Sequence, residues 1–179
     1  VDTIEIEAAM IEGARHFRPR NELAYTDPRS HFIIDDAKAF FARSSARYDI
    51  IVSEPSNPWV SGVASLFSDE FYDRIRNYLT DDGVLVQWIQ IYEIEPELVG
   101  SIIRALGRHF PNYEIYAADT GNLLLVATRS NKPLELSDRI FKMPALEADL
   151  RRLGIGHLGD LVPRRVAGSK VFRAWIGDG

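Results

Sequence analysis

The feature that most constrains the fold is the regular alternation of short apolar runs with helical stretches. Strands are predicted at 1–7, 31–35, 48–54, 84–91, 113–117 and 123–128. Apolar residues spaced three or four apart predict helices at 8–17, 37–47, 68–79 and 96–110. A proline-containing stretch at 18–29 is predicted to be a loop, with room for a short strand at 23–25. This alternation is typical of βαβ units, so we expect an α/β fold with a mostly parallel sheet.

Two segments refine the expected sheet. The run YDIIVSE at 48–54 is nearly continuous in apolar residues, which is typical of a central parallel strand buried on both faces. A turn is predicted at 81–83, before the next strand. The last two strands have only a short turn between them, and a short turn cannot join a parallel pair. They are therefore expected to be antiparallel and to lie at the edge of the sheet.

Composition excludes several classes of function. The 179 residues suffice for one domain with a short appendage. The chain has no cysteine, which excludes disulfides, a cysteine nucleophile and thiolate metal ligands. Its four histidines are far apart in sequence, so no metal site is expected. The net charge of -5 argues against nucleic-acid binding, and no apolar run approaches the length of a membrane helix.

Polar residues follow several of the predicted strands, where open α/β sheets bind their ligands. Glu5 and Asp36 follow two early strands, Glu54 ends the apolar run, and Gln87 lies in the next strand. A carboxylate after a strand can accept the hydroxyls of a ribose, and a second one can accept the amino group of adenine. The alternative is that such acids cap the following helix.

The strings IEIE, DDAKAFF, YDIIVSEPSNPW, GVASLFSDEFY and DDGVLVQW resemble the polyamine aminopropyltransferases, the spermidine and spermine synthases. The likeness covers about residues 1–130 and is greatest to the spermidine-synthase-like domains that bacteria fuse to multi-span membrane segments. It implies a Rossmann-like sheet of the class I methyltransferase type, a role in polyamine biosynthesis and a cytoplasmic location. It allows a membrane segment in the parent protein.

The resemblance also implies roles for individual residues. Glu5 matches the acid that binds the ribose, and Asp36 matches the acid that reads adenine. Glu54 matches the proposed base that deprotonates the attacking amine, and its place after a buried strand would fix and partly desolvate it. Ser56 and Asn57 belong to the loop that holds the amine.

The chain departs from the family pattern at several of these positions. Asn57 stands where the family has a second acid, which weakens the case for a doubly charged diamine. The family's strand glutamine falls at Trp88, so Gln87 beside it becomes the candidate substrate contact. The string DTGN at 119–122 lacks a tyrosine and proline that contact the diamine in the family. Trp59 is expected either to stack on a ligand or to cover an apolar edge.

The predicted domains are a spermidine-synthase-like domain at 1–132 and a small helical appendage at 133–179. The first is expected to lack its initial strand and glycine-rich loop, which would precede Val1, and so to bind its nucleoside weakly by itself. The expected reaction moves an aminopropyl group from decarboxylated S-adenosylmethionine to an amine, with no prosthetic group. The alternatives are an S-adenosylmethionine-dependent methyltransferase-like enzyme and a non-catalytic module. The family often dimerises, so a homodimer is a further possibility.

Overall fold

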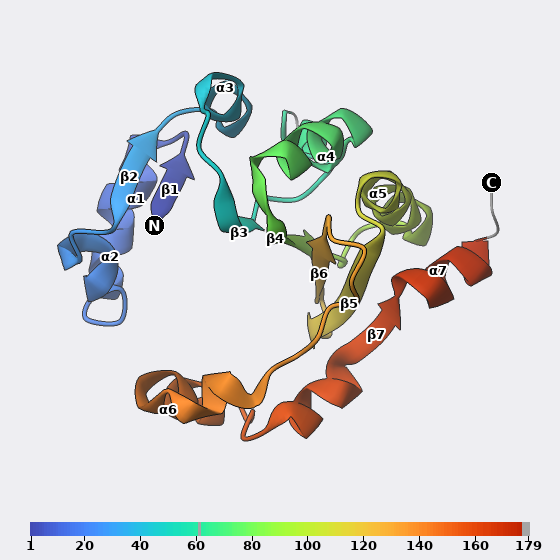
Figure 1. The fold of residues 1–179 in the computed structure, drawn as a ribbon. Coiled ribbons are helices and arrows are strands. Elements are labelled where there is room, and N and C mark those ends of the chain that lie inside the picture. The colour runs from blue at the N-terminus through green and yellow to red at the C-terminus, as the bar shows by residue number, and fades with distance from the viewer. Residues whose placement is uncertain (61, 177–179) are drawn as a thin grey trace. The chain divides into compact units, whose positions relative to one another are not determined.

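The structure is a computed structural model that describes residues 1–60 and 62–176 (Figure 1). The chain folds into two compact units, Val1–Ala46 and Arg47–Gly179. This division differs from the expected one at residue 132, because the segment beyond that point adds a strand to the sheet of the second unit.

The second unit is built on a sheet with the strand order β3-β4-β6-β5-β7. The strands are β3 (Tyr48–Ser53), β4 (Leu79–Gln90), β5 (Asn112–Asp119), β6 (Asn122–Thr128) and β7 (Arg165–Gly168). β3 and β4 are parallel, and β6 is antiparallel to β4. β6 is also antiparallel to β5, as expected for two strands joined by a short turn. The expectation that β5 and β6 form the edge is wrong, because β7 pairs with β5.

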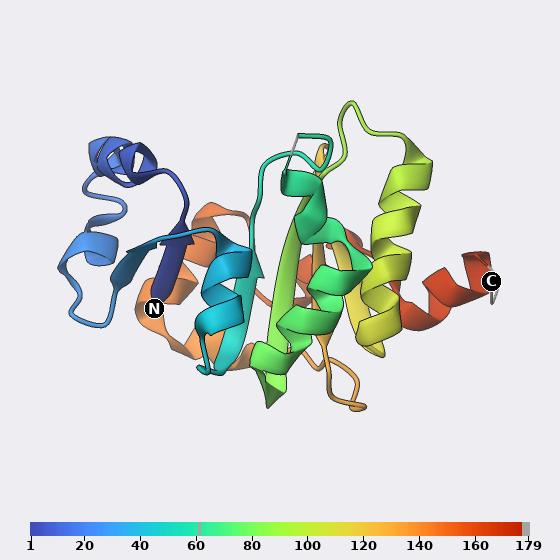
Figure 2. The same ribbon diagram turned by 90° about the horizontal axis from the view of Figure 1, so that it is seen from above.

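The helices α4 and α5 lie side by side against one face of this sheet (Figure 2). The helical segments of the unit are η2 (Val63–Phe67), α4 (Asp69–Ile75), η3 (Arg76–Tyr78), α5 (Pro96–His109), η4 (Asp138–Lys142), α6 (Pro144–Arg152), η5 (Leu158–Arg164) and α7 (Ser169–Ile176). Ser68 caps α4, since its hydroxyl accepts the Phe71 N–H at 3.2 Å. The core lies between α4, α5 and the sheet, where Ile75, Leu85 and Leu106 are buried.

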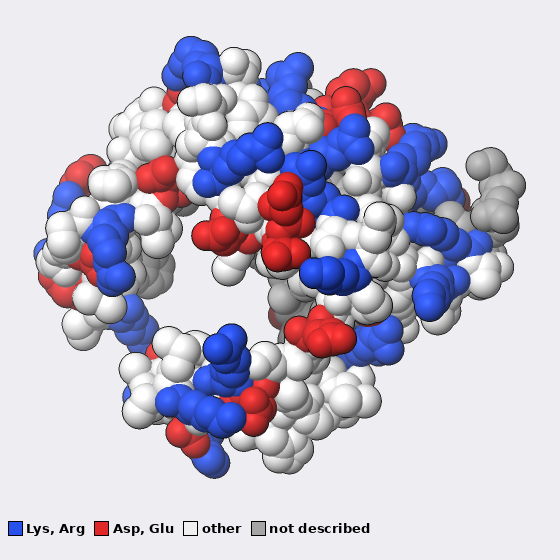
Figure 3. Space-filling view, viewed as in Figure 1, with Lys and Arg blue, Asp and Glu red and all other residues white. Residues whose placement is uncertain are grey.

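The helices have two further properties, one of charge and one of length. Lys and Arg side chains gather over α5 and α7 on the face seen in Figure 3. Within the described residues, no helix combines the length and the apolar composition that crossing a bilayer requires.

Two expectations about β3 and β4 are wrong. β3 is an edge strand of its sheet, and Ile50 and Val52 on one face are each 64% exposed, so it is not buried on both faces. The residues 81–83, expected to form a turn, lie within β4. They form an irregularity there, because the pairing shifts from Tyr48 opposite Leu79 to Ile50 opposite Val84.

We expect Ile75→Ala to lower the free energy of unfolding by about 2–5 kcal/mol, since it removes buried methyl groups and leaves a cavity. Ile75 is 1% exposed and Ile50 is 64% exposed. The matched substitution Ile50→Ala is therefore expected to cost less than about 1 kcal/mol. Urea denaturation followed by circular dichroism measures both, and equal losses would contradict the described packing of β3.

The first unit contains a two-stranded parallel sheet with four helical segments. The strands are β1 (Asp2–Glu5) and β2 (His31–Ile34), and the helical segments are α1 (Ala8–Ala14), η1 (Arg15–Phe17), α2 (Glu22–Thr26) and α3 (Ala37–Arg43). α2 lies where a loop or short strand was expected. Its five residues are too few to show a repeated helical spacing of apolar residues. Side chains anchor its two ends: Tyr25 donates to the Ile11 carbonyl and Asn21 to the Ala14 carbonyl, each at 2.7 Å.

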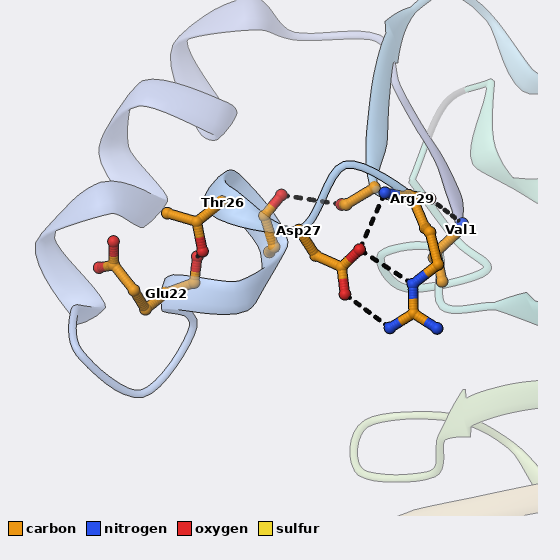
Figure 4. Close-up of polar contacts among 7 residues, drawn as sticks. Val1, Glu22, Thr26, Asp27 and Arg29 are labelled. Atoms are coloured by element: carbon orange, nitrogen blue, oxygen red, sulfur yellow. Dashed lines mark hydrogen bonds and ion pairs between the residues drawn. The ribbon is translucent and has the colours of Figure 1, made fainter.

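The turn between α2 and β2 is organised by Asp27 and Arg29 (Figure 4). Arg29 donates to the Asp27 carboxylate from its backbone at 2.8 Å and from its guanidinium at 3.0 and 2.7 Å. The carbonyl of Arg29 in turn accepts a hydrogen bond from the nitrogen of Val1. These bonds stabilise the ionised carboxylate, so the pKa of Asp27 lies well below its usual range.

This arrangement predicts how the turn responds to acid. The pKa of Asp27 is lower in the folded chain than in the unfolded chain. The ionised carboxylate therefore stabilises the fold fully above the ordinary carboxyl pKa of about 4, and this stabilisation is lost as the pH falls through the pKa of the folded state. The carboxyl carbon shift of Asp27 is therefore expected to show an ionised group at pH values where free aspartate is protonated. Arg29→Gln should return the pKa of Asp27 toward its ordinary value, whereas Arg43→Gln should not. An unchanged titration in Arg29→Gln would contradict this assignment.

Candidate active site

The loop after β3 carries Glu54, the predicted base. β3 and β4 are parallel, so their carboxyl ends lie at the same edge of the sheet, with Ser53 opposite Gln87. The Glu54 side chain is exposed, and its carboxylate has no hydrogen-bond or ion-pair partner among the described residues. The expected partial desolvation is therefore not found. Both carboxylate oxygens nevertheless remain available to a ligand, because no described residue forms a hydrogen bond or an ion pair with them.

Gln87, in β4, links that strand to the end of β3. It is fully buried in the row that also contains Leu85 and Ile89, and its Nε2 donates to the carbonyls of Ser53 at 3.2 Å and Trp88 at 3.1 Å. Its Oε1 is buried and has no hydrogen-bond partner in the described structure. The amide nitrogen therefore holds the end of β3 against β4, and the amide oxygen is left as an unused acceptor.

Asn57 presents a second acceptor of the same kind. Its Oδ1 is buried without a hydrogen-bond partner among the described residues, while its carbonyl accepts the Val60 N–H at 3.0 Å. Pro58, which follows, is buried, whereas Ser56 is exposed. A buried carbonyl oxygen without a donor carries a desolvation cost that a ligand N–H can remove. The loop is thus suited chemically to a hydrogen-bond donor.

A third unused acceptor, Asn122, was missed by the sequence analysis. Its Oδ1 is buried without a partner in the described structure, and it lies opposite Gln90 at the end of β4. The Asp119 carboxylate holds this turn by accepting the Gly121 N–H at 2.7 Å and the Asn122 side-chain amide at 2.8 Å. These two hydrogen bonds lower the pKa of Asp119, and the bond from the Gly121 N–H has the larger effect. The string DTGN, which encodes this turn, was the available signal.

Trp59 lies beside Tyr92, which follows β4. Their ring centroids are 6.4 Å apart at 79°, an edge-to-face arrangement. Trp59 remains 42% exposed, and the Tyr92 hydroxyl donates to Gln90 at 3.2 Å. Trp59 therefore covers an aromatic neighbour and still offers ring surface to a ligand, so both expectations for it stay open.

Within the first unit, Glu5 and Asp36 lie at the carboxyl edge of the β1–β2 pair. Glu5 Oε1 accepts the Glu7 N–H at 2.9 Å, and Asp36 Oδ1 caps α3 by accepting the Ala39 N–H at 2.9 Å. The capping alternative is thus realised for Asp36. Each carboxylate keeps its second oxygen without a partner among the described residues. Glu5 and Asp36 can therefore each accept one further hydrogen bond from a ribose or an adenine.

No group of three or more potential metal ligands occurs among the residues that the structure describes.

The family model of the spermine/spermidine synthase domain matches residues 1–125. The chain belongs to this family. The polyamine aminopropyltransferase of Pectobacterium carotovorum is 30% identical over 139 residues, which cover 74% of this chain and 48% of that protein. Polyamine aminopropyltransferase 2 of Streptomyces coelicolor is 33% identical over 128 residues, 68% of this chain and 23% of that protein. The chain spans about half or less of the length of these curated relatives.

Solved structures confirm the Rossmann-like fold of the class I methyltransferase type. A spermidine synthase in complex with the transition-state analogue AdoDATO superposes with a TM-score of 0.63 at 18% identity, covering 86% of this chain and 60% of that one. A probable spermidine synthase from Corynebacterium glutamicum gives a TM-score of 0.66 at 16% identity, with coverages of 99% and 61%. Human methyltransferase-like protein 13 in complex with SAH gives 0.60 at 18%, with coverages of 85% and 69%.

Proposed function

We propose that the protein carrying this chain transfers an aminopropyl group from decarboxylated S-adenosylmethionine to an amine acceptor. Family membership supports the reaction class. The observation that carries the proposal for this site is the pair of buried, unused amide oxygens of Asn57 and Gln87, beside the strand end that precedes Glu54. Acceptor oxygens without donors suit an amine, because its N–H groups supply the missing hydrogen bonds.

The nucleoside part of the donor is assigned to the first unit. The free oxygen of Glu5 would accept a ribose hydroxyl, and the free oxygen of Asp36 would accept the amino group of adenine. Both groups keep one oxygen engaged with the backbone, which holds each carboxylate in a defined position. Decarboxylated S-adenosylmethionine thus acts as a co-substrate, and intact S-adenosylmethionine is the donor in the alternative below.

The chemical step is a displacement at carbon. The amine nitrogen uses its lone pair to form a bond to the aminopropyl carbon next to the sulfonium. The carbon–sulfur bond breaks, and its electron pair stays on sulfur, which becomes the neutral thioether of methylthioadenosine. Glu54 acts as general base and takes a proton from the attacking nitrogen, so that the amine enters the displacement with a free lone pair and leaves as a neutral amine. Exposure of the Glu54 side chain gives the proton a route to solvent.

The acceptor pocket is less acidic than the family pattern implies, because Asn57 contributes a neutral oxygen. This favours an acceptor with fewer positive charges than a free diamine, with Ser56 and Trp59 as further contacts. The same neutrality supports one alternative, methyl transfer from intact S-adenosylmethionine to a less cationic acceptor. A homodimer, a membrane-fused parent and a cytoplasmic location remain predictions.

The test uses the full-length protein that carries this chain. It is incubated with decarboxylated S-adenosylmethionine and, in separate reactions, with putrescine, spermidine and a monoamine, and methylthioadenosine is quantified by chromatography. Amine-dependent release of methylthioadenosine supports the proposal. Release of S-adenosylhomocysteine from intact S-adenosylmethionine, with no methylthioadenosine, would replace it by methyl transfer. No turnover of either donor would favour a non-catalytic module.

A further inference from the structure

The second unit contains a cavity of about 640 Å³ at the end of the sheet opposite to Glu54. α5 begins after the carboxyl end of β4 and ends at His109, just before β5, so its C-terminus lies at the far end of the sheet. The cavity is lined there by η3, the end of α5, the residue after β6, and α7. It is therefore separate from the strand ends that carry Gln87 and the Glu54 loop.

Four arginines line this cavity, and two of them are paired with acids. Arg76 contacts Asp73 at 2.9 Å, and Arg108 contacts Asp69 at 2.9 Å. His109 lies between the same two carboxylates, at 3.1 Å from Asp69 and 3.4 Å from Asp73. The two acids thus balance the charges of Arg76 and Arg108.

The other two arginines, Arg129 and Arg173, keep their positive charge. Arg129 Nη1 donates to the carbonyls of Arg76 at 3.4 Å and Leu79 at 3.3 Å, and Arg173 Nη2 donates to the Pro111 carbonyl at 2.8 Å. Carbonyl oxygens are neutral, and neither guanidinium has a carboxylate partner in the described part of the chain. The cavity therefore has two guanidinium charges in excess.

An independent observation also indicates a missing acceptor. The Nε of Arg76 is buried and has no hydrogen-bond partner among the described residues. A buried donor without an acceptor is costly, and here it belongs to a side chain that lines the cavity. An anion in the cavity would supply negative charge beside this side chain and beside Arg129 and Arg173.

We propose that this cavity binds an anion with phosphate groups, of the size of a diphosphate. Guanidinium groups present planar pairs of N–H donors that match phosphate oxygens. The uncompensated charges of Arg129 and Arg173 would neutralise most of the charge of a diphosphate, and the cavity volume admits more than a single phosphate. This cavity would bind anions, whereas the carboxyl edge of β3 and β4, which carries Glu54, is assigned to an amine. The two sites would therefore select ligands of opposite charge.

The other role open to Arg129 and Arg173 is to satisfy backbone carbonyls, which requires no ligand. The two roles are separated by titration calorimetry of the full-length protein with inorganic pyrophosphate at low ionic strength. We expect saturable binding of one pyrophosphate per chain, weakened by added salt. Arg129→Gln and Arg173→Gln are each expected to raise the dissociation constant about tenfold. Arg104→Gln removes the same charge from exposed α5 surface outside the lining and should change it less than about twofold.

A parallel titration with ADP distinguishes the source of the phosphate groups. Equal affinity for pyrophosphate and ADP assigns recognition to the diphosphate alone, and tighter binding of ADP adds contacts to its nucleoside; both support the site. Thermal melts verify that each variant folds, and if Arg129→Gln does not, Arg173→Gln decides. The proposal is overturned if the wild-type protein shows no saturable binding below about 10 mM pyrophosphate. It is also overturned if a folded lining variant binds as the wild type does.

Discussion

Glu54→Gln is expected to lower kcat for aminopropyl transfer by about 100- to 10,000-fold, the usual contribution of a general base. Glutamine preserves the size of the side chain and removes its capacity to take a proton. The Glu54 carboxylate has no partner among the described residues, so the substitution breaks no internal contact and should leave folding intact. The measurement is steady-state release of methylthioadenosine, with the concentrations of donor and amine varied separately.

The pattern of the kinetic constants identifies the role. The KM for the nucleoside donor should be unchanged, and Glu54→Asp, which keeps the carboxylate, should recover part of the activity. Glu97→Gln, at an exposed acid in the first turn of α5, serves as the matched control and should leave kcat unaltered. A kcat for Glu54→Gln within about threefold of the wild type would exclude Glu54 as the base.

The sequence predicted the elements whose signals are local. α5 (Pro96–His109) has a proline in its first turn and a continuous apolar face, so both its type and its limits were predicted. The antiparallel pairing of β5 and β6 followed from the length of the turn between them. In contrast, the four-residue strand β7 and the five-residue helix α2 are defined by their partners, namely β5 for the strand and the α1 segment for the helix.

The apolar run in β3 shows that an apolar sequence does not by itself determine which side chains are buried. Ile50, Ile51 and Val52 are consecutive, which predicts burial on both faces of the strand. In the described structure Ile51 is buried and its two neighbours are 64% exposed. An apolar side chain indicates that burial would be favourable, but the residues that provide a cover are set by the tertiary structure.

The candidate site was predictable in position and only partly in role. Glu54 and Asn57 were found because the carboxyl ends of parallel strands share one edge. The burial of Gln87 depends on the phase of β4, which places it in the same row as Leu85 and Ile89. Asn122 reaches this edge through its pairing with Gln90, a register that the sequence alone does not fix.

Glu5→Gln is expected to raise the KM for decarboxylated S-adenosylmethionine about 10- to 100-fold with little change in kcat. A ribose hydroxyl bound to a carboxylate makes a charge-assisted hydrogen bond of about 1.5–3 kcal/mol, which the neutral amide weakens or loses. Glutamine keeps an oxygen that can accept the Glu7 N–H at the end of β1, so the local fold should be preserved.

The contrast between the two variants separates donor binding from chemistry. Glu5→Gln should leave the KM of the amine unaltered, whereas Glu54→Gln should leave the KM of the donor unaltered. Glu7→Gln is the matched control, because the Glu7 carboxylate is two residues away and accepts the Ala9 N–H at the start of α1. It should cost a fraction of a kcal/mol in stability, about what a weakened helix cap costs, with no change in the KM of the donor. If Glu5→Gln and Glu7→Gln raise that KM equally, Glu5 supports the fold of the first unit and does not bind the ribose.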